Sequence, residues 1–498
     1  MPEGRRDVTE RGLRLVLVVA GVMLAALMQT LDTTITNVAL PNIQGNLGAG
    51  QDEGTWIVTA YTIAAIIVIP LTPWLQGRFG RKRYFLASIV GFTFASLLCA
   101  WSSSLEALVA ARVVQGAFGG GLLATAQSIL RDTFPPRRLG LSQGIFALGA
   151  VMGPALGPPL GGFLVDNASW NWAFEINVIP GTIAVVLLAL LLRDPDAKRD
   201  SPIDVPGLAL LATTLSSLQY VLTEGERHDW LADPAVALGI AICAACAAGF
   251  VWWELHGTAT PIVDLRILRS RTVAAGTILS GVIGIAAFGS SYTLPQLTQG
   301  QLGFTPTLSG LLVLVRALPI LAATLPIVFL AARLDTRVLV GIGFLVTGIS
   351  SAMIAQATTA DSTFATFVLP MVLSGIGIVT LYIPLSIAVL GATTPEQGPK
   401  ASAFLNLALQ LGGSAGIAVL TTFVDRREAF HSTILAGAAT LSSLRARGFV
   451  APNPAQLAHL IDAQAIVLSY ADASYLVALL GVVCIPLVFL LRRPRTAR

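Results

Sequence analysis

The feature that most restricts the fold of this chain is a series of fourteen apolar segments, each at least 18 residues long. A helix of that length crosses a hydrocarbon core about 30 Å thick. Charged residues make up only 12% of the chain, against about 25% in soluble domains. The pattern predicts an all-α integral membrane protein with fourteen transmembrane helices. The expected spans are residues 13–37, 55–75, 84–101, 107–130, 139–163, 173–192, 205–222, 234–253, 273–298, 308–331, 338–356, 364–391, 401–424 and 474–491.

Basic residues are distributed unevenly between the two sides of these spans. Of the 31 Lys and Arg residues, 24 lie in the two terminal segments and every second loop, and five lie in the other loops. Because loops rich in Lys and Arg stay in the cytoplasm, the sequence predicts cytoplasmic termini and a multi-pass protein of the cell inner membrane. The same bias accounts for the net charge of +4, so the lipid bilayer is an expected partner and nucleic acid is not.

Two weak repeats recur at nearly one offset. Pro41 and Pro295 lie near the ends of the first and ninth spans, 254 positions apart, and Arg78 and Arg333 lie 255 positions apart between equivalent spans. This agreement in order and topology predicts two six-helix bundles with two spans inserted between them. The expected units are residues 1–193, 194–260 with the inserted pair, and 261–498.

Asp32 lies inside the first apolar segment, where a carboxylate costs roughly 2.5–3.5 kcal/mol on insertion scales. Helical spacing places Gln29, Asp32, Thr33 and Thr36 on one face, which we expect to point into the bundle. Asp32 is then either an acid that reaches interfacial water or a protonatable carboxylate in a cavity. The cost of burial favours the second interpretation.

Arg112 lies inside the fourth span, with Gln115 one turn later on the same face. Its long side chain could reach the outer interface, or it could pair with Asp32 across the interior. In the second case, movement of Arg112 relative to Asp32 would switch the carboxyl group between its charged and protonated forms. A proton-coupled transporter needs such a switch.

Two further charges accompany apolar spans. Glu175 opens the sixth span, where it is either an interfacial residue or a second titratable or substrate-binding acid. Arg316 lies in the tenth span and is either a contact for a substrate anion or a hydrogen-bond donor to backbone carbonyls.

No enzyme signature is present in the sequence. It contains no phosphate-binding loop, and the histidines have no metal-ligand spacing. The four cysteines lie in apolar spans, where they act as small packing residues. We therefore expect no enzymatic activity, no metal and no cofactor. The histidines are His228, His256, His431 and His459.

Four sequence stretches carry a family resemblance. They are LDTTITNVALP (31–41), ARVVQGAFGGG (111–121), GPALGPPLGG (153–162) and WELHGTATPIVDLRILRSR (253–271). In this order they resemble the major facilitator superfamily, specifically its fourteen-span drug:proton antiporters of the EmrB/QacA type. The resemblance implies multidrug efflux, and hence antibiotic resistance, by alternating access. The partners it implies are protons and hydrophobic or amphipathic small molecules.

A row of glycines in the fifth span supports this direction of transport. Their four-residue spacing allows close helix packing in any membrane protein. The pattern also resembles the antiporter motif of the superfamily, which implies export. The residues are Gly153, Gly157, Pro158, Gly161 and Gly162.

The loop between the second and third spans departs from the superfamily pattern, because Pro73 and Gly77 replace its first glycine and its acid. The basic part remains and is expected to form a cytoplasmic gating loop. Its residues are Arg78, Gly80, Arg81 and Lys82.

The longest loop is expected at residues 425–473, outside the cytoplasm. Its apolar residues have helical spacing, so it could form two helices that cap the outer vestibule. The resemblance to EmrB implies another role, the docking of a periplasmic adaptor of the membrane fusion protein class. For the whole chain, the alternatives to drug export are a narrow-range exporter or uptake symporter of a specific solute, and a passive channel or non-transporting membrane receptor.

Overall fold

A computed structural model describes residues 12–193, 203–225, 229–258, 261–394, 396–438 and 454–491. Every regular element in this part of the chain is a helix. Fourteen helical segments are long and apolar enough to cross a membrane, which confirms the predicted fold class and number of spans. The basic residues before position 12 and after position 491 lie outside the described residues.

The main helices overlap the predicted spans, although some run past them and some spans are divided between two helices. They are α1 (Gly12–Leu47), α2 (Gln51–Phe79), α3 (Arg81–Ala100), α4 (Leu105–Gly119), α5 (Leu122–Thr133), α6 (Leu139–Asn167), α7 (Trp172–Glu175), α8 (Val178–Leu191), α9 (Val205–Glu224), α10 (Pro234–Trp252), α11 (Arg271–Gly300), α12 (Pro306–Ala331), α13 (Thr336–Ala357), α14 (Phe364–Gly391), α15 (Gly398–Ala438) and α17 (Pro454–Val483). Shorter helices are η1 (Pro136–Arg138), η2 (Trp230–Ala232), η3 (Trp253–Gly257), η4 (Leu265–Arg269) and η5 (Ile485–Leu490).

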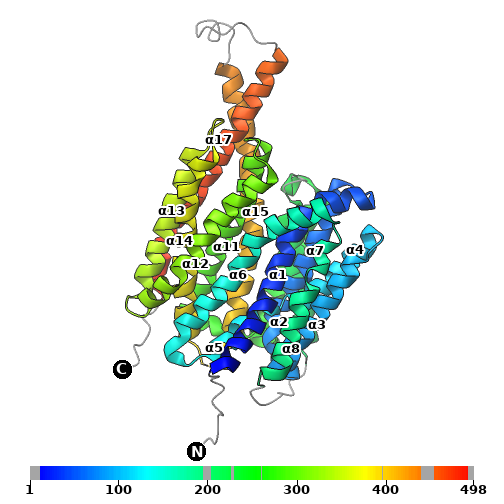
Figure 1. Ribbon diagram of the computed structural model, residues 1–498, viewed down its shortest axis with the longest axis vertical. Helices are drawn as coiled ribbons and strands as arrows, with labels where there is room; N and C mark the ends of the chain where they lie inside the picture. The colour runs from blue at the N-terminus through cyan, green and yellow to red at the C-terminus, as the bar shows by residue number, and fades with distance from the viewer. Residues whose placement is uncertain are drawn as a thin grey trace, which may run out of the picture.

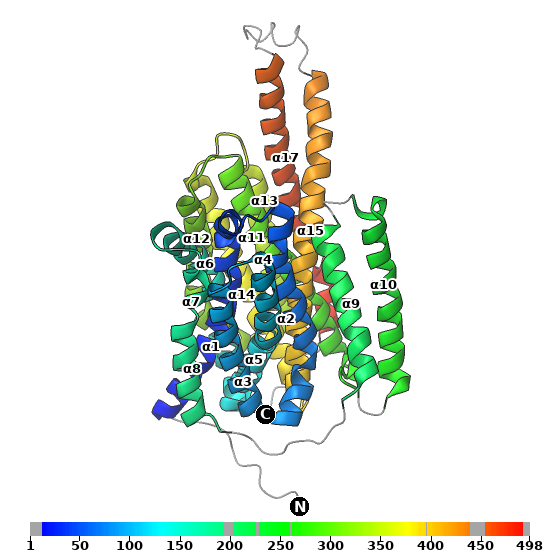
Figure 2. The same cartoon turned by 90° about the vertical axis from the view of Figure 1, so that its right-hand side faces the viewer.

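The helices form two groups that meet along a long interface. The first group contains α1 to α8 and the second contains α11 to α17. In Figure 1, α1 to α4, α7 and α8 lie on the right, α12 to α14 lie on the left, and α5, α6, α11 and α15 run through the centre. Across the interface α6 packs against α12 and α14, and α15 packs against α2 and α5. Helix α9 packs against α2 and α15 at the edge of the bundle, and α10 packs mainly against α9 (Figure 2). Helix α1 begins, and η5 stops, at the same end of the bundle (Figure 1). We call it the terminal end.

The glycine spacing in α6 brings this helix close to α1. An added Cβ at Gly153 or Gly157 would overlap a threonine hydroxyl of α1, and one at Gly161 would press against its backbone. The Thr34 hydroxyl also donates to the Gly153 carbonyl oxygen over 3.2 Å. At Gly162, in contrast, nothing lies within 4 Å of an added Cβ. Three of the four glycines therefore form the α1-facing side of α6.

Replacing Gly157 by valine is expected to separate α6 from α1, because forcing extra groups into a packed contact costs about 1–3 kcal/mol. The melting temperature of the purified protein should fall, and transport should fall with it. Gly162→Val introduces the same side chain into open space and serves as the matched control. An equal loss in both variants would contradict this packing explanation.

The two helix groups are joined at the terminal end by Arg131, in the last turn of α5. Its guanidinium donates to the carbonyl oxygens of Leu390 and Thr393 over 3.0 and 2.9 Å, where α14 ends. A cation is favourable there because the C-terminus of a helix carries partial negative charge. A second bond across the interface runs from Asn406 Nδ2 to Gln127 Oε1 over 2.8 Å.

The sequence predicts a gating loop between the second and third spans, and the prediction that these residues form a loop is wrong. Arg78 lies in the last turn of α2, Arg81 and Lys82 lie in the first turn of α3, and only Gly80 separates the two helices. The reversal needs a single residue because Gly80 has a φ of 85°, which glycine adopts without steric cost. Arg81 instead forms an ion pair of 2.5 Å with Asp132, at the end of α5.

We expect Arg131→Gln to loosen the terminal end, since it removes the hydrogen bonds that join α5 to the end of α14. Spin labels on the exposed residues Arg83 and Leu334 would report the distance between the groups, and a population at longer distance should grow. Arg137→Gln removes an exposed charge nearby and should leave the distances unchanged. Identical distributions for both variants would show that Arg131 does not hold the interface closed.

Residues 425–473 are not the loop that the sequence predicts. Helix α15 continues to Ala438 and α17 begins at Pro454, and residues 439–453 between them lie outside the described residues. Residues 425–438 contain no proline, so α15 extends about 21 Å past the expected end of its span. The two helices form a hairpin, residues 425–438 and 454–472, that projects beyond the other helices instead of folding over them (Figures 1 and 2).

The hairpin is fastened near its base by three side chains. Arg427 Nε donates to Asp472 Oδ2 over 2.6 Å, and His431 Nε2 lies 2.8 Å from the same oxygen. These contacts join α15 to α17 at the point where both helices leave the bundle.

Candidate functional site

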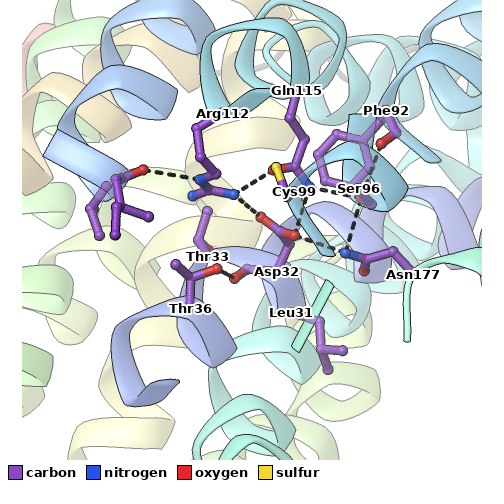
Figure 3. Close-up of polar contacts among 12 residues, drawn as sticks. Leu31, Asp32, Thr33, Thr36, Phe92, Ser96, Cys99, Arg112, Gln115 and Asn177 are labelled. Atoms are coloured by element: carbon purple, nitrogen blue, oxygen red, sulfur yellow. Dashed lines mark hydrogen bonds and ion pairs between the residues drawn. The ribbon is translucent and has the colours of Figure 1, made fainter. Parts of the chain in front are cut away.

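A buried group of polar side chains surrounds Asp32 inside the N-terminal helices (Figure 3). Asp32 is fully buried. Its Oδ2 accepts from Arg112 Nη1 over 2.6 Å, and its Oδ1 accepts from Gln115 Nε2 over 2.8 Å and Asn177 Nδ2 over 2.7 Å. Helices α1 and α4 and the residue before α8 thus meet at one carboxylate. Asp32 therefore does not reach the interface, and of the two sequence interpretations the interior position is correct.

Arg112 is also fully buried, so its side chain does not extend to the outer interface. Besides Asp32, its guanidinium donates to the Ile57 carbonyl oxygen over 3.0 Å and to Gln115 Oε1 over 2.5 Å. Its Cζ lies 4.2 Å from the centre of the Tyr61 ring, close enough for a cation–π contact. The planar guanidinium uses several directions at once, which a lysine could not do.

Ser96, Asn177 and Cys99 belong to the group and were not among the predicted site residues. The Cys99 thiol donates to Gln115 Oε1 over 3.6 Å. Ser96, in α3, accepts from Gln115 Nε2 over 2.8 Å and from Asn177 Nδ2 over 3.3 Å. The Oδ1 atom of Asn177 is buried and has no hydrogen-bond donor within the described residues. The available signal for Asn177 was an amide side chain inside an apolar span, two residues after Glu175.

The other candidate residues have different positions. Gln29 is buried and accepts from the backbone N–H of Leu123 over 3.1 Å, and the Thr36 hydroxyl donates to the Asp32 backbone oxygen over 2.7 Å. Both residues lie beside the group, and neither has a described hydrogen bond to the Asp32 carboxylate. Glu175 is half-buried and its carboxylate forms no hydrogen bond or ion pair with the described residues, so the structure does not bring it to Asp32.

The described part of the C-terminal helices has no charged counterpart of this group. At the offset of 254 to 255 positions, Ala286 and Ser351 correspond to Asp32 and Ser96. Both line a cavity between α11, α13, α14 and α17, the helices equivalent to α1, α3, α4 and α8, and its lining is apolar or hydroxyl-bearing. The buried ion pair is therefore a property of one half.

The bonding pattern is that of an ionised carboxylate, because all three neighbours donate to Asp32. Removing water from an ion pair costs free energy. The hydrogen bonds to Asp32 offset this cost only while the side chains keep their relative positions. The relative position of α1 and α4 therefore determines whether this ion pair stays together.

The described part of the chain offers no candidate metal centre. Within it, no group of three or more His, Cys, Asp or Glu side chains could hold a metal ion. His228 lies outside the described residues.

Comparisons with known proteins give a consistent result. The family model "Major Facilitator Superfamily" matches residues 22–292 and 276–498. The chain is 35% identical over 424 residues to the multidrug export protein EmrB of Escherichia coli K12, covering 84% of this chain and 82% of that protein. It is 34% identical over 426 residues to the fatty acid resistance protein FarB of Neisseria gonorrhoeae, covering 85% and 83%.

A solved structure has the same fold. The human organic anion transporter MFSD10 superposes with a TM-score of 0.63 at 18% identity, covering 95% of this chain and 100% of that one. From the fourteen spans, the paired helix groups and these matches, the chain belongs to the major facilitator superfamily and is a multi-pass membrane transporter of the EmrB type.

Proposed function

We propose that this protein exports hydrophobic or amphipathic small molecules in exchange for protons, by alternating access between α1–α8 and α11–α17. The observation that carries the proposal is the fully buried Asp32, held in its charged form by Arg112, Gln115 and Asn177. An ionisable group kept inside a membrane bundle is characteristic of a proton pathway. The relatives named for multidrug export and fatty acid resistance support export as the direction.

The proposed cycle uses rearrangement of the Asp32 group. With the interface closed at the terminal end, Asp32 is ionised and paired with Arg112. When the transporter changes state, α4 shifts relative to α1 within the N-terminal group, Arg112 withdraws and Asp32 takes up a proton. The protonated carboxyl then donates to the unpartnered Oδ1 of Asn177, once that amide has turned. Asn177 would therefore stabilise either state of Asp32, which lowers the cost of switching between them.

The free energy available from protons is sufficient for drug export. One elementary charge is worth about 2.3 kcal/mol per 100 mV, and each pH unit adds about 1.36 kcal/mol. One proton at 100 mV and one pH unit supplies about 3.7 kcal/mol, enough for a several-hundredfold gradient of a neutral compound.

The proposed orientation places the terminal end in the cytoplasm of a cell inner membrane. This is supported by the excess of Lys and Arg in the terminal segments and alternate loops. Arg131 then joins the two helix groups on the cytoplasmic side, and the hairpin extends on the outer side.

The hairpin supports a further part of the proposal, docking of a periplasmic adaptor. Phe430, Ile434 and Leu460 are 48%, 51% and 62% exposed on it. Apolar side chains exposed outside the membrane favour contact with another protein. Since the hairpin projects away from the bundle, it can reach such a partner without blocking the exit path (Figure 2).

Deleting residues 432–468 tests this role. Whole-cell drug resistance should fall toward that of cells without the protein, while proton-coupled transport by the purified variant in liposomes continues. A milder variant, Phe430→Ser with Leu460→Ser, keeps the helices and should reproduce the loss in cells. Loss of transport in liposomes as well would favour a role within the transporter, and unchanged behaviour in both assays would exclude both roles.

Proton release from inverted membrane vesicles tests the antiport itself. Vesicles with an acid interior should lose protons when a transported drug is added, as a pH-sensitive dye can report. Vesicles carrying Asp32→Asn provide the control. Drug entry that stops at equal concentrations and moves no protons would favour a passive channel, and proton movement in the same direction as solute would favour an uptake symporter.

A further inference from the structure

Arg316 is a permanent positive charge in the interior of the C-terminal helices. It lies 10 residues after the start of α12 and 15 before its end, roughly 15 and 22 Å along the helix. Its side chain is 8% exposed. Exposed apolar side chains form a row along one side of α12. One of them, Leu318, is turned about 160° from Arg316 around the helix axis. Arg316 therefore points away from the lipid-facing side of its helix.

The described residues supply too few partners for this charge. A guanidinium has five N–H donors, and the described contact is one bond from Arg316 Nη2 to Ser291 Oγ over 2.5 Å. None of the ion pairs among the described residues includes Arg316. In contrast, the equally buried Arg112 has a carboxylate, an amide oxygen and a backbone carbonyl as acceptors.

This difference decides between the two interpretations of Arg316. A structural donor to backbone carbonyls would have carbonyl acceptors, and none is present within the described residues. A buried cation that lacks a counter-charge is costly, so its retention indicates that an anion binds there during function. The anion has to come from outside this part of the chain.

We propose that Arg316 binds the anionic group of the exported compound, so that the substrates include amphipathic organic anions. These consist of a carboxylate or sulfonate joined to an apolar body. A planar guanidinium can hold two oxygens of such a group side by side. Arg316 reaches Ser291 of α11, so a ligand bound to it would lie beside the contact of α12 with α11. This inference rests on the export function proposed above.

An anionic substrate also has an electrical consequence. An anion moving out and a proton moving in both carry positive charge inward, so a one-for-one exchange transfers two charges. Exchange of a neutral compound transfers one charge, and exchange of a monovalent cation transfers none. A membrane potential, negative inside, would thus drive the export of an anion more strongly than that of either alternative.

Binding to the purified full-length protein tests the inference. The probes are 1-naphthalenesulfonate and 1-naphthoate as anions, and 1-naphthalenesulfonamide as a neutral analogue, measured by isothermal titration calorimetry. In Arg316→Gln the Kd of both anions should rise about 10-fold to 100-fold, because a charge-assisted hydrogen bond is lost. The Kd of the sulfonamide should change less than about 2-fold, which also shows that the variant is folded.

Two further variants separate charge from packing. Ser291→Ala removes the described partner of Arg316 and keeps the cation, so anion binding should persist. Arg316→Lys keeps the charge without the planar fork, and its affinity should lie between those of the wild type and Arg316→Gln. Equal loss of anions and sulfonamide in Arg316→Gln, or no loss of either, would overturn the inference. So would a wild-type protein that binds neither anion.

The same measurements distinguish this inference from the proposed function. If the wild type moves protons in response to drugs but binds neither anion, export stands and the anion site is wrong. If it binds both anions through Arg316 and never exchanges them for protons, the site stands and antiport is wrong. In liposomes, uphill transport of 1-naphthalenesulfonate should accelerate with an imposed membrane potential, and a rate independent of potential would contradict the two-charge exchange.

Discussion

Asp32→Asn is expected to abolish uphill export while the protein still reaches the membrane. Asparagine matches the size of aspartate but cannot bind and release a proton at physiological pH. Its amide can still accept from Arg112, and Gln115 can turn to present its oxygen, so the buried group keeps most of its hydrogen bonds. The gradient of exported drug should drop from as much as several hundredfold to none, since the proton no longer contributes free energy.

The measurement is drug accumulation in inverted vesicles with an imposed pH gradient, together with drug exchange in the absence of a gradient. Exchange should survive in Asp32→Asn, because alternating access with bound drug needs no net proton transfer. Asp32→Glu keeps the titratable group and should retain part of the coupled activity. Uphill export by Asp32→Asn that still responds to pH would show that another residue carries the proton.

The sequence was sufficient to predict the fold for a physical reason. Spans such as 364–391 must satisfy every backbone hydrogen bond inside lipid, so an apolar run of that length can only be a helix. The end of α15 could not be found this way, because residues 425–438 are polar enough to leave the membrane and still favourable for helix. Hydropathy marks where a span leaves lipid, and it does not mark where the helix ends.

The candidate site was predicted only in its charged part. Asp32 and Arg112 were identified because charge inside lipid is costly whatever the fold. Ser96 and Asn177 are uncharged. Serine and asparagine are common enough in membrane helices that residue type alone does not identify them as site residues. Their role depends on α3 and the start of α8 meeting at Asp32, a tertiary contact that a single sequence does not encode in any local pattern.

Replacing Arg112 is expected to cause the second large loss, through stability as well as transport. In Arg112→Gln the ionised Asp32 remains buried with only amide donors, and breaking a buried ion pair in this way costs about 3–5 kcal/mol. Arg112→Lys restores a charge but cannot reach Ile57, Gln115 and Asp32 together from one ammonium. We expect Arg112→Gln to denature at much lower temperature, and Arg112→Lys to fold with export reduced at least about 10-fold.

The double variant Asp32→Asn with Arg112→Gln distinguishes a stability effect from a coupling effect. Removing both charges leaves four neutral groups that can hydrogen-bond to one another, and neutral replacement of a buried ion pair is often neutral or stabilising. Its melting temperature should therefore return close to that of the wild type, while uphill export stays absent because no proton carrier remains. If the double variant is as unstable as Arg112→Gln alone, the cost lies in lost contacts of the arginine with Ile57 and Tyr61 instead of in the unpaired carboxylate. If it is stable and still exports uphill, neither member of the pair carries the proton.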